Sequence, residues 1–593
     1  MRRRPRTTFY VSFFAILLFA AFSLHLSRNA ISGWEPDSDF PNLNTNIPIH
    51  RNSNIIQEFT RQTRRVSSIK DTPLSTVSIL FPDWEILVIV SPNTPFSFSD
   101  QYHCLFPNNA KSRAMFSGVL PYTNRTTFKC DMPESVRRRG MFTQPMLVAG
   151  TSENEFPNLS QARELIRWNF LVYESFSTED DVVLFAKGVN HRQGYDRSPK
   201  ELRCVFDIGN GIRKAVTSSV QEVFRCPHPD PSELGLDFNY ERGQRIGVSI
   251  EIVAENVVVP SVAYYTPRPR PKLKADVVGV REDIGSKAQT WPKHSLCACT
   301  MVYNVAKFLR EWVTYHSKLG VENFILYDNA SDDDLYGVIE ELRAEGYNIS
   351  TLFWIWPKTQ EAGFSHSVLY SKSKALCTWI MYVDVDEFVF SPSWGHGKGK
   401  GNPSLKSLLP KETLRRGGRD REEGIRKSRI GQVSIRCLEF GPSGQRKHPV
   451  EGVTQGYTCR RRVDRRHKSM VLVDAVDPSL RNVIHHFQVK ESEGFRSKQV
   501  RVEEALVNHY KYQAWDEFKC KFRRRVSAYV VDWTQNVNLN SKDRTPGLGF
   551  QAIEPKDWKQ RFCEVRDDRL KSFTRAWFGS VTPNGYTMPW QSI

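Results

Sequence analysis

The segment WIMYVDVDEFVF at residues 379–390 contains three carboxylates, Asp384, Asp386 and Glu387, in a run that otherwise has the composition of a buried strand. Side chains at positions i and i+2 of a strand point to the same face, and if the strand ends between them the loop brings them together. Two like charges in a medium of low dielectric constant are costly without a cation. Mg²⁺ and Mn²⁺ prefer carboxylate oxygens and often keep substrate phosphates as further ligands. The segment therefore indicates a site where a metal neutralises a diphosphate leaving group.

Two other interpretations of a D-x-D pair remain open on this segment alone. The first is a turn at the end of a strand whose acids are solvated and have no function. Phosphoryl transfer of the haloacid-dehalogenase type uses an aspartate of such a pair as nucleophile. That class normally has Thr or Val two residues after the second aspartate, where this chain has Phe388. An EF-hand is excluded because its later ligands and its glycine are absent.

Histidines and cations further along the chain have the chemistry to complete such a site. His485 and His486 follow an apolar strand in RNVIHHF, and either imidazole is a suitable metal ligand. A core or surface histidine is the alternative for both. Lys468, and His509 and Lys511 in the motif NHYK, are donors suited to phosphate oxygens.

The elements that must position these groups alternate between strand and helix. Such alternation predicts a parallel sheet with helices on both faces, and ligands bind at the carboxyl ends of its strands. That rule places Asn304, Asp328, Asn329 and the Asp384–Glu387 segment at one edge of the sheet. The predicted strands cover residues 294–304, 322–333, 348–357 and 380–390, and the predicted helices cover 306–320, 334–346 and 365–379.

Residues 76–265 have a different sequence pattern, in which short runs of β-branched and aromatic residues are separated by turn residues. This spacing is typical of a β-sandwich, which either binds sugar or supports its neighbour. One helix is predicted inside the region, at residues 160–175, and a last helical stretch is predicted at 505–533. A Gly/Lys/Arg-rich stretch at about 395–429 is predicted to be a basic insertion.

The N-terminus has the pattern of a membrane anchor. Four arginines precede an apolar run from Phe9 to Leu26, and a helix of about 17–25 residues spans a bilayer. A cleaved signal peptide is the rival, but LHLSRN is a poor match to its small-residue cleavage site. The arginines stay cytosolic by the positive-inside rule. The pattern therefore predicts a single-pass type II protein with a lumenal catalytic part.

Sequons and cysteines agree with a lumenal location. Eleven cysteines suit an oxidising compartment, and near-sequence neighbours predict the disulfides Cys104–Cys130 and Cys204–Cys226. The odd count leaves at least one thiol unpaired. The four N-x-S/T sequons lie at Asn124, Asn158, Asn329 and Asn348.

The net charge of +18 favours an anionic partner, such as a phosphorylated ligand, an acidic polysaccharide or a membrane surface. We expect no nucleic-acid partner, because no zinc finger, helix-turn-helix or basic-aromatic repeat accompanies the charge.

A set of ordered motifs resembles glycosyltransferase family 92, in particular its plant branch, which includes the pectic β-1,4-galactan synthases. The resemblance covers about residues 294–540 and implies a GT-A fold (Rossmann-like, α/β), a Golgi type II topology, a UDP-sugar donor and Mn²⁺ (or Mg²⁺). The β-rich region is similar in position to the carbohydrate-binding module of the galactan synthases. The motifs, in order, are TMVYNVAKFLREWVTYHSKLGVENFILYDNASDDD, YVDVDEF, FGPSG, GYTCR, HKSMV, VIHHF and NHYK.

The resemblance also implies roles for single residues. Asp384 and Asp386 match the metal-binding D-x-D, and His485 is the expected third metal ligand, with His486 the alternative. Tyr303 and Asn304 end the first strand, where uracil and ribose are expected.

Asp328 and Asn329 end the second strand beside that nucleoside position. The Asn329 sequon is then expected to be unused, because a glycan there would block the donor. The insertion at 395–429 has no counterpart in the resemblance.

The reaction implied is inverting transfer of a sugar, with galactose expected, to a cell-wall or glycoprotein glycan. A carboxylate should deprotonate the acceptor hydroxyl. Glu451 is our choice among Glu439, Glu451 and Asp464, and Glu387 is expected to be structural. A catalytically inactive, membrane-anchored carbohydrate-binding or scaffold protein is the alternative, and a homodimer is a further expectation.

The expected layout has seven parts. They are a cytosolic tail at 1–8, an anchor at 9–27, a stem at 28–75, a β-rich domain at 76–265, a linker at 266–293, a transferase domain at 294–545 and a C-terminal extension at 546–593.

Overall fold

The structure is a computed structural model of the full chain. The predicted tail and anchor, the stem up to residue 73, and most of the linker and of the basic insertion lie outside the residues it describes. Among those it does describe, no helix has the length and apolar character to cross a membrane. The described residues are 74–591 apart from 93, 95–99, 138–141, 151–162, 191–194, 207–210, 231, 235–244, 268–291, 396–401, 412–428, 464–465, 484, 528–553 and 584.

The β-rich domain begins with a seven-stranded sheet of order β6-β3-β4-β5-β2-β1-β7. Apolar side chains on one face of this sheet, among them Ile86, Val88 and Leu147, form a buried core. The disulfide Cys104–Cys130 lies in that core. The strands are β1 Thr76–Leu80, β2 Glu85–Val90, β3 Tyr102–Leu105, β4 Lys111–Val119, β5 Thr126–Asp131, β6 Met146–Ala149 and β7 Ile166–Arg167.

Two further sheets of the β-rich domain enclose a second apolar core. The disulfide Cys204–Cys226 joins them, from β10 to β13, so the sandwich prediction is confirmed for this half of the region. The first sheet has β11 Ile212–Ala215, β10 Leu202–Phe206, β14 Ile246–Ile252, β15 Val257–Val258 and β16 Tyr264–Tyr265; the second has β12 Ser218–Val220, β13 Val223–Pro227, β9 Asp181–Lys187 and β8 Leu171–Ser177.

The helix predicted at 160–175 is wrong in its described part, because residues 163–175 contain β7 and most of β8. Leu171 through Phe176 are all buried. A strand that is buried on both faces lacks strict alternation, and its continuous apolar run cannot be told from a buried helix by periodicity.

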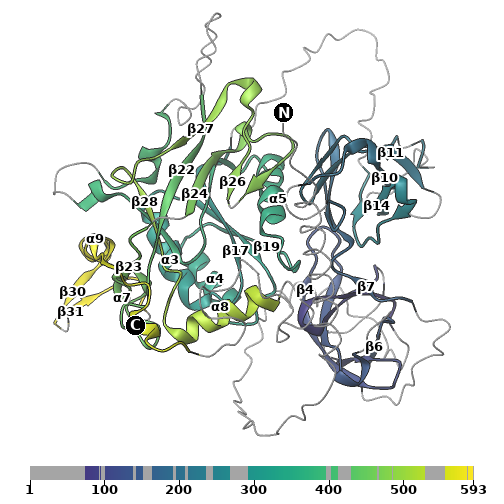
Figure 1. The fold of residues 1–593 in the computed structure, drawn as a ribbon, viewed down its shortest axis with the longest axis horizontal. Helices are drawn as coiled ribbons and strands as arrows, with labels where there is room; N and C mark the ends of the chain where they lie inside the picture. Colours follow the sequence, from purple (N-terminus) through teal and green to yellow (C-terminus); the bar gives the residue numbers. More distant parts are fainter. Residues whose placement is uncertain are drawn as a thin grey trace, which may run out of the picture. The chain divides into compact units, whose positions relative to one another are not determined.

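The transferase domain contains a nine-stranded sheet of order β19-β18-β17-β20-β24-β22-β28-β21, with β27 paired to β22 (Figure 1). The pairs β19–β18, β18–β17 and β17–β20 are parallel, as predicted. The strands are β17 His294–Val302, β18 Asn323–Asp328, β19 Ile349–Phe353, β20 Cys377–Tyr382, β21 Glu387–Phe390, β22 Arg429–Glu439, β24 Arg466–Leu472, β27 Phe495–Gln499 and β28 Leu506–His509.

Three helices make the crossovers between the parallel strands, α3 Ala306–Lys318, α4 Leu335–Ala344 and α5 Gln360–Ser373. Helix α3 buries Phe308, Leu309, Trp312 and Val313, whose spacing puts them on one face. The disulfide Cys297–Cys377 links neighbouring strands β17 and β20. The predicted alternation of strand and helix is therefore confirmed.

The strand predicted at 380–390 is in fact two strands. β20, in the interior of the sheet, ends at Tyr382, and β21 begins at Glu387 at an edge of the sheet, where it pairs with β28. Two hydrogen bonds close the turn between them: Glu387 N–H donates to the Asp384 carbonyl at 2.9 Å, and Asp384 N–H donates to Glu387 Oε2 at 2.8 Å. The Asp384 and Asp386 side chains thus lie on a turn at the carboxyl end of β20.

The helix predicted at 505–533 begins only at α8, Trp515–Ser527, because residues 506–509 form β28. This short segment is buried between β22 and β21, so strand pairing overrides its local pattern.

The C-terminal extension belongs to the same core as the transferase domain. Its strand β29, Val565–Arg566, pairs with β23, Cys459–Arg460, and the disulfide Cys459–Cys563 links the same two segments. Helix α9, Arg569–Phe578, packs on the short helix α7, Val453–Gly456. The two predicted disulfides are confirmed, and Cys299, Cys437 and Cys520 are free thiols.

Candidate active site

The Asp384 carboxylate, just after the end of β20, accepts hydrogen bonds from two side chains. Lys468 Nζ, from β24, donates to Asp384 Oδ2 at 2.7 Å, and Gln360 Nε2, at the start of α5, donates to Oδ1 at 3.0 Å. Burial alone would raise the pKa of the Asp384 carboxyl, but the Lys468 ammonium beside it lowers that pKa to about 2. Asp384 is therefore an anion with a built-in counter-ion.

Asp386 has a second, separate set of partners. Lys521 Nζ, from α8, donates to Asp386 Oδ2 at 2.7 Å, and His509 Nε2 lies 3.7 Å from the same oxygen. The Tyr510 N–H holds the Asp386 carbonyl at 2.9 Å. Burial opposes ionisation of the Asp386 carboxyl, but Lys521 and His509 hold its pKa well below the usual range.

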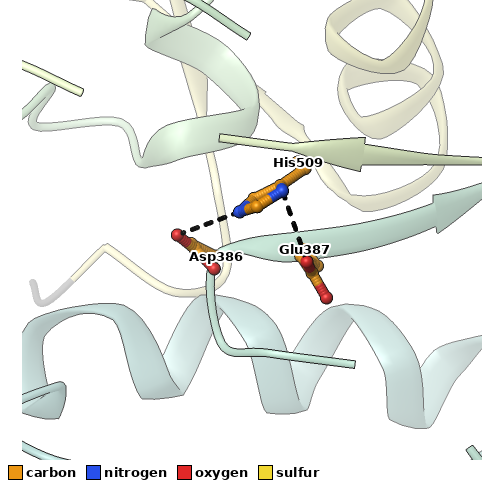
Figure 2. Close-up of side chains that lie close together, drawn as sticks. All are labelled: Asp386, Glu387 and His509. Carbon is orange, nitrogen blue, oxygen red and sulfur yellow. Dashed lines mark ion pairs between the residues drawn. The ribbon is translucent and has the colours of Figure 1, made fainter. Parts of the chain in front are cut away.

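The His509 imidazole lies between Asp386 and Glu387, as Figure 2 shows. His509 and Glu387 are cross-strand partners in β28 and β21, and His509 Nδ1 lies 3.4 Å from Glu387 Oε1. Glu387 has no exposed surface. Burial and the neighbouring Asp384 carboxylate raise its pKa, against the pull of the Lys468 ammonium.

These three side chains have the donor set for a divalent cation. Asp386, Glu387 and His509 each offer one ligand atom, and those atoms all lie within 4.8 Å of one another. Within the described residues, buried Glu387 Oε1 and His509 Nδ1 make no hydrogen bond of ordinary geometry. Carboxylate oxygen with imidazole nitrogen suits Mn²⁺, so the residues fit the metal that was expected.

His485, the predicted third ligand, lies beside Asp384 rather than in that group. Its Nε2 is 2.6 Å from Lys468 Nζ and 3.7 Å from Asp384 Oδ2. Burial, and then the Lys468 charge, lower the pKa of the imidazole to about 3, so neutral His485 accepts a hydrogen bond from the Lys468 ammonium. His486 instead faces His467, with ring centroids 4.0 Å apart.

Lys468 and Lys511, predicted as phosphate donors, are both engaged with carboxylates. Lys468 is buried and also contacts Glu387 Oε2 at 2.9 Å. Lys511 Nζ donates to Glu439 Oε1 at 2.6 Å. The third predicted donor, His509, is part of the metal group instead.

The ends of β17 and β18 are joined by a polar network, as their position in the sheet predicts. Asn304 and the exposed Asp332 bond reciprocally: the Asn304 amide donates to the Asp332 carboxylate, and Asp332 N–H donates to Asn304 Oδ1 at 2.9 Å. Asp328 accepts from Ser331 N–H at 2.9 Å and from the Tyr336 hydroxyl at 3.0 Å. Asn304 thus faces the open edge, whereas Asp328 shapes the loop beneath it.

Asn329 and Tyr303 differ in how far they are buried. Buried Asn329 donates its amide to the carbonyls of Trp354 and Trp356, which supports the expectation that its sequon is unused. Tyr303 is half-buried after β17, beside Asn304.

The carboxylates considered as acceptor base are spread apart. Glu451 is exposed, its carbonyl accepts from Trp590 Nε1 at 2.8 Å, and its charge acts on Lys571 of α9. Among the described contacts, none joins Glu451 to the Asp384 cluster. Glu439 is buried, and although burial would raise the pKa of its carboxyl, Lys511 lowers it. Asp464 lies outside the described residues.

Sequence reasoning missed two partners of the D-x-D turn, Gln360 and Lys521, and the contact of Glu387 with His509. The motif NHYK did single out His509, but no local signal says that β28 pairs with β21. Lys521 sits in a basic helix whose charges give no sign of which one reaches an acid.

Comparison with known proteins shows which family the chain belongs to. The glycosyltransferase family 92 model matches residues 293–542. A family 92 protein of Arabidopsis thaliana is 42% identical over 437 residues, covering 73% of this chain and 70% of that protein. Another, of Ricinus communis, is 36% identical over 548 residues, covering 89% and 87%.

The chain belongs to glycosyltransferase family 92. The family model spans every residue of the Asp384, Asp386 and His509 arrangement, and membership supports glycosyltransferase activity. Among solved structures, a glucosyl-3-phosphoglycerate synthase from Mycobacterium tuberculosis, in complex with Mn²⁺, UDP and glucosyl-3-phosphoglycerate, is 10% identical, covers 40% of this chain and 78% of that chain, and has a TM-score of 0.19.

Proposed function

We propose that this family 92 glycosyltransferase is metal-dependent and takes its sugar from a UDP-sugar. The observation that supports the proposal is the group of Asp386, Glu387 and His509, beside Asp384 at the carboxyl end of β20, which pairs in parallel with β17. Ligand sites of open α/β sheets lie at that edge.

Each of these residues has a role that its contacts support. Asp386 and His509 would hold the cation, and buried Glu387, whose Oε1 lies 3.4 Å from His509 Nδ1, would orient the imidazole ring. Lys468 keeps Asp384 ionised, and Gln360 orients its carboxylate. A bound divalent cation supplies charge that neutralises a diphosphate leaving group.

The nucleoside half of the donor belongs beside Asn304 in this proposal. The Asn304 and Asp332 pair is partly open to solvent at the end of β17, and both side chains have groups that can bond a ribose or a uracil edge. Asn329 does not take part, because its amide is used on two backbone carbonyls.

The finer features of the proposal follow from the family resemblance and the N-terminal pattern. They are inverting transfer of galactose to a cell-wall or glycoprotein glycan, a Golgi location with type II topology, and a homodimer. Acceptor deprotonation requires a carboxylate base, and Glu451 has no contact with the cluster among the described residues.

The test is transfer by the purified full-length protein, measured as UDP release with Mn²⁺ and a panel of UDP-sugars and glycan acceptors. We expect transfer that stops in EDTA and falls at least about 100-fold in Asp386→Asn, which keeps the shape of the side chain. Glu451→Gln is the matched control, expected to retain activity. Activity of the wild type in EDTA would contradict metal dependence, and glycan binding without UDP affinity would favour the inactive scaffold.

A further inference from the structure

A very short hairpin carries His485 into the active site. Its strands, β25 Asn482–Val483 and β26 His486–Phe487, have two residues each, and His485 lies in the turn with φ of 69°. An isolated two-stranded hairpin is marginal at best in water. Something outside the hairpin must therefore hold His485 against Lys468 and Asp384.

The Ser469 hydroxyl of β24 donates to the His485 carbonyl, and two glutamines hold the hairpin itself, one on each outer edge. Gln432 of β22 donates its Nε2 to the Phe487 carbonyl at 3.1 Å and accepts from the Phe487 N–H at 2.9 Å. Gln221 donates its Nε2 to the Asn482 carbonyl at 2.8 Å and accepts from the Asn482 N–H at 3.1 Å. Each primary amide thus pairs with the hairpin as a neighbouring strand would.

The two glutamines come from different domains. Gln432 belongs to the transferase sheet, whereas Gln221 is in the β12–β13 turn of the β-rich domain. The turn is itself fixed, because the Gln221 N–H donates to Asp196 Oδ1 at 2.9 Å. Gln221 has φ of 55°, a left-handed conformation that only a specific turn maintains for a long side chain.

Asn482, which Gln221 holds, is connected to the surroundings of the D-x-D turn in two ways. The Asn482 side-chain amide donates to the Glu361 carbonyl and to Ser365 Oγ, both at 2.9 Å, and so reaches α5 next to Gln360. Three residues after Asn482, His485 Nε2 contacts Lys468 Nζ at 2.6 Å. A shift of the Asn482 edge would therefore move groups on both sides of Asp384.

We propose that Gln221 is a positioning residue of the active site, which makes the β-rich domain a structural part of the catalytic unit whether or not it binds sugar. The inference rests on the proposed function for its effect on transfer. Its structural part, that Gln221 orders the hairpin at 482–487, stands independently of any reaction.

The experiment compares Gln221→Asn with Gln144→Asn in the full-length protein. Asn tolerates the left-handed conformation at position 221, but its amide is one methylene too short to reach Asn482. Gln144 is a matched control, since it also clamps backbone, accepting from the Ser78 N–H at 3.1 Å and donating to the Glu164 carbonyl at 3.0 Å, inside the first β-sheet.

Hydrogen exchange of the amides in 482–487 and the kinetics of transfer are the two readouts. We expect faster exchange at Asn482, and a kcat about tenfold lower, in Gln221→Asn alone, with similar Tm in the two variants. Gln221→Glu keeps the acceptor for the Asn482 N–H and should fall between wild type and Gln221→Asn.

The outcomes separate the inference from the proposed function. Equal exchange and equal kcat in the two variants would overturn the role of Gln221. Faster exchange with unchanged kcat would also overturn it, because Gln221 would then order the hairpin without serving the reaction. No transfer by the wild type would contradict the proposed function, while hydrogen exchange would still decide whether Gln221 orders the hairpin.

Discussion

His509 and Glu387 face each other across strands β28 and β21, with 3.4 Å between His509 Nδ1 and Glu387 Oε1. The other ring nitrogen, Nε2, lies 3.7 Å from Asp386 Oδ2, so the imidazole stands between the two carboxylates (Figure 2). Metal-binding histidines commonly have such a carboxylate partner, which sets the ring orientation and raises its basicity. His509 is therefore a better candidate for the metal ligand than His485.

The first prediction compares these two histidines. His509→Asn should weaken Mn²⁺ binding by at least about tenfold, because it removes a ligand. His485→Asn should change Mn²⁺ affinity by less than about threefold, since its Nε2 is committed to Lys468. Calorimetric titration with Mn²⁺ measures both, and a larger loss in the His485 variant would reverse the assignment.

The second prediction concerns Lys521, whose ammonium donates to Asp386, a proposed metal ligand, at 2.7 Å. A cation in this position competes with a divalent ion for the same carboxylate. Lys521→Met should therefore tighten Mn²⁺ binding by about threefold to tenfold. Lys519→Met, on the same helix and at an exposed position, is the control. Weaker binding in the Lys521 variant would show that the ammonium supports the site rather than competes for it.

The third prediction concerns Gly452, which precedes α7 with φ of 99°. A Cβ there would lie 2.4 Å from Glu311 Oε2 and 2.6 Å from Trp590 Nε1. Gly452→Ala should lower the free energy of unfolding by about 3 kcal/mol, from the left-handed backbone and the clash together.

Gly346→Ala isolates the backbone part of that cost. Gly346 has φ of 94°, and a Cβ there would meet nothing within 4 Å. Its expected loss is about 1 kcal/mol, measured for both variants by urea unfolding. Equal losses in the two variants would mean that the Glu311 and Trp590 side chains move away from the new Cβ without lowering the stability.

The fourth prediction is a pH dependence of stability from Glu311. Its carboxylate is buried and accepts from the N–H groups of Val453 and Thr454 at 2.7 and 3.0 Å. Burial raises its pKa from 4.5 to about 7, against these hydrogen bonds. The folded protein then binds the proton more tightly than the unfolded chain, so this contribution to stability is fully present below pH 4.5 and is lost as the pH rises through 7.

Glu311→Gln removes that titration while it keeps one acceptor oxygen. Between those two pH values, the wild type should lose about 3 kcal/mol more stability than the variant. Urea unfolding at both ends of the window measures the difference. A wild type that instead gains stability over this window, relative to the variant, would mean that the pKa of Glu311 is depressed by its hydrogen bonds.

The sequence by itself determined the features that depend on local pattern. Alternation of strand and helix predicted the parallel strands β17, β18, β19 and β20, and turn residues marked the β-rich domain. Near-sequence cysteine pairs predicted two disulfides correctly, and Asp384 and Asp386 were found from the charge inside an apolar run. Each of these signals is carried by residues of one segment of the chain, and even the two paired cysteines of each disulfide are only 26 and 22 residues apart.

Tertiary structure decided which distant groups meet at those acids. Strand β21 pairs with β28 and not with its chain neighbour β20, and this order alone brings His509 to Asp386. Likewise Gln221 reaches Asn482 across two domains, and Cys459 reaches Cys563 across a sequence separation of 104. Such pairings depend on the order of strands in a sheet and on the packing of one domain against another, and neither leaves a trace in local hydrophobic periodicity.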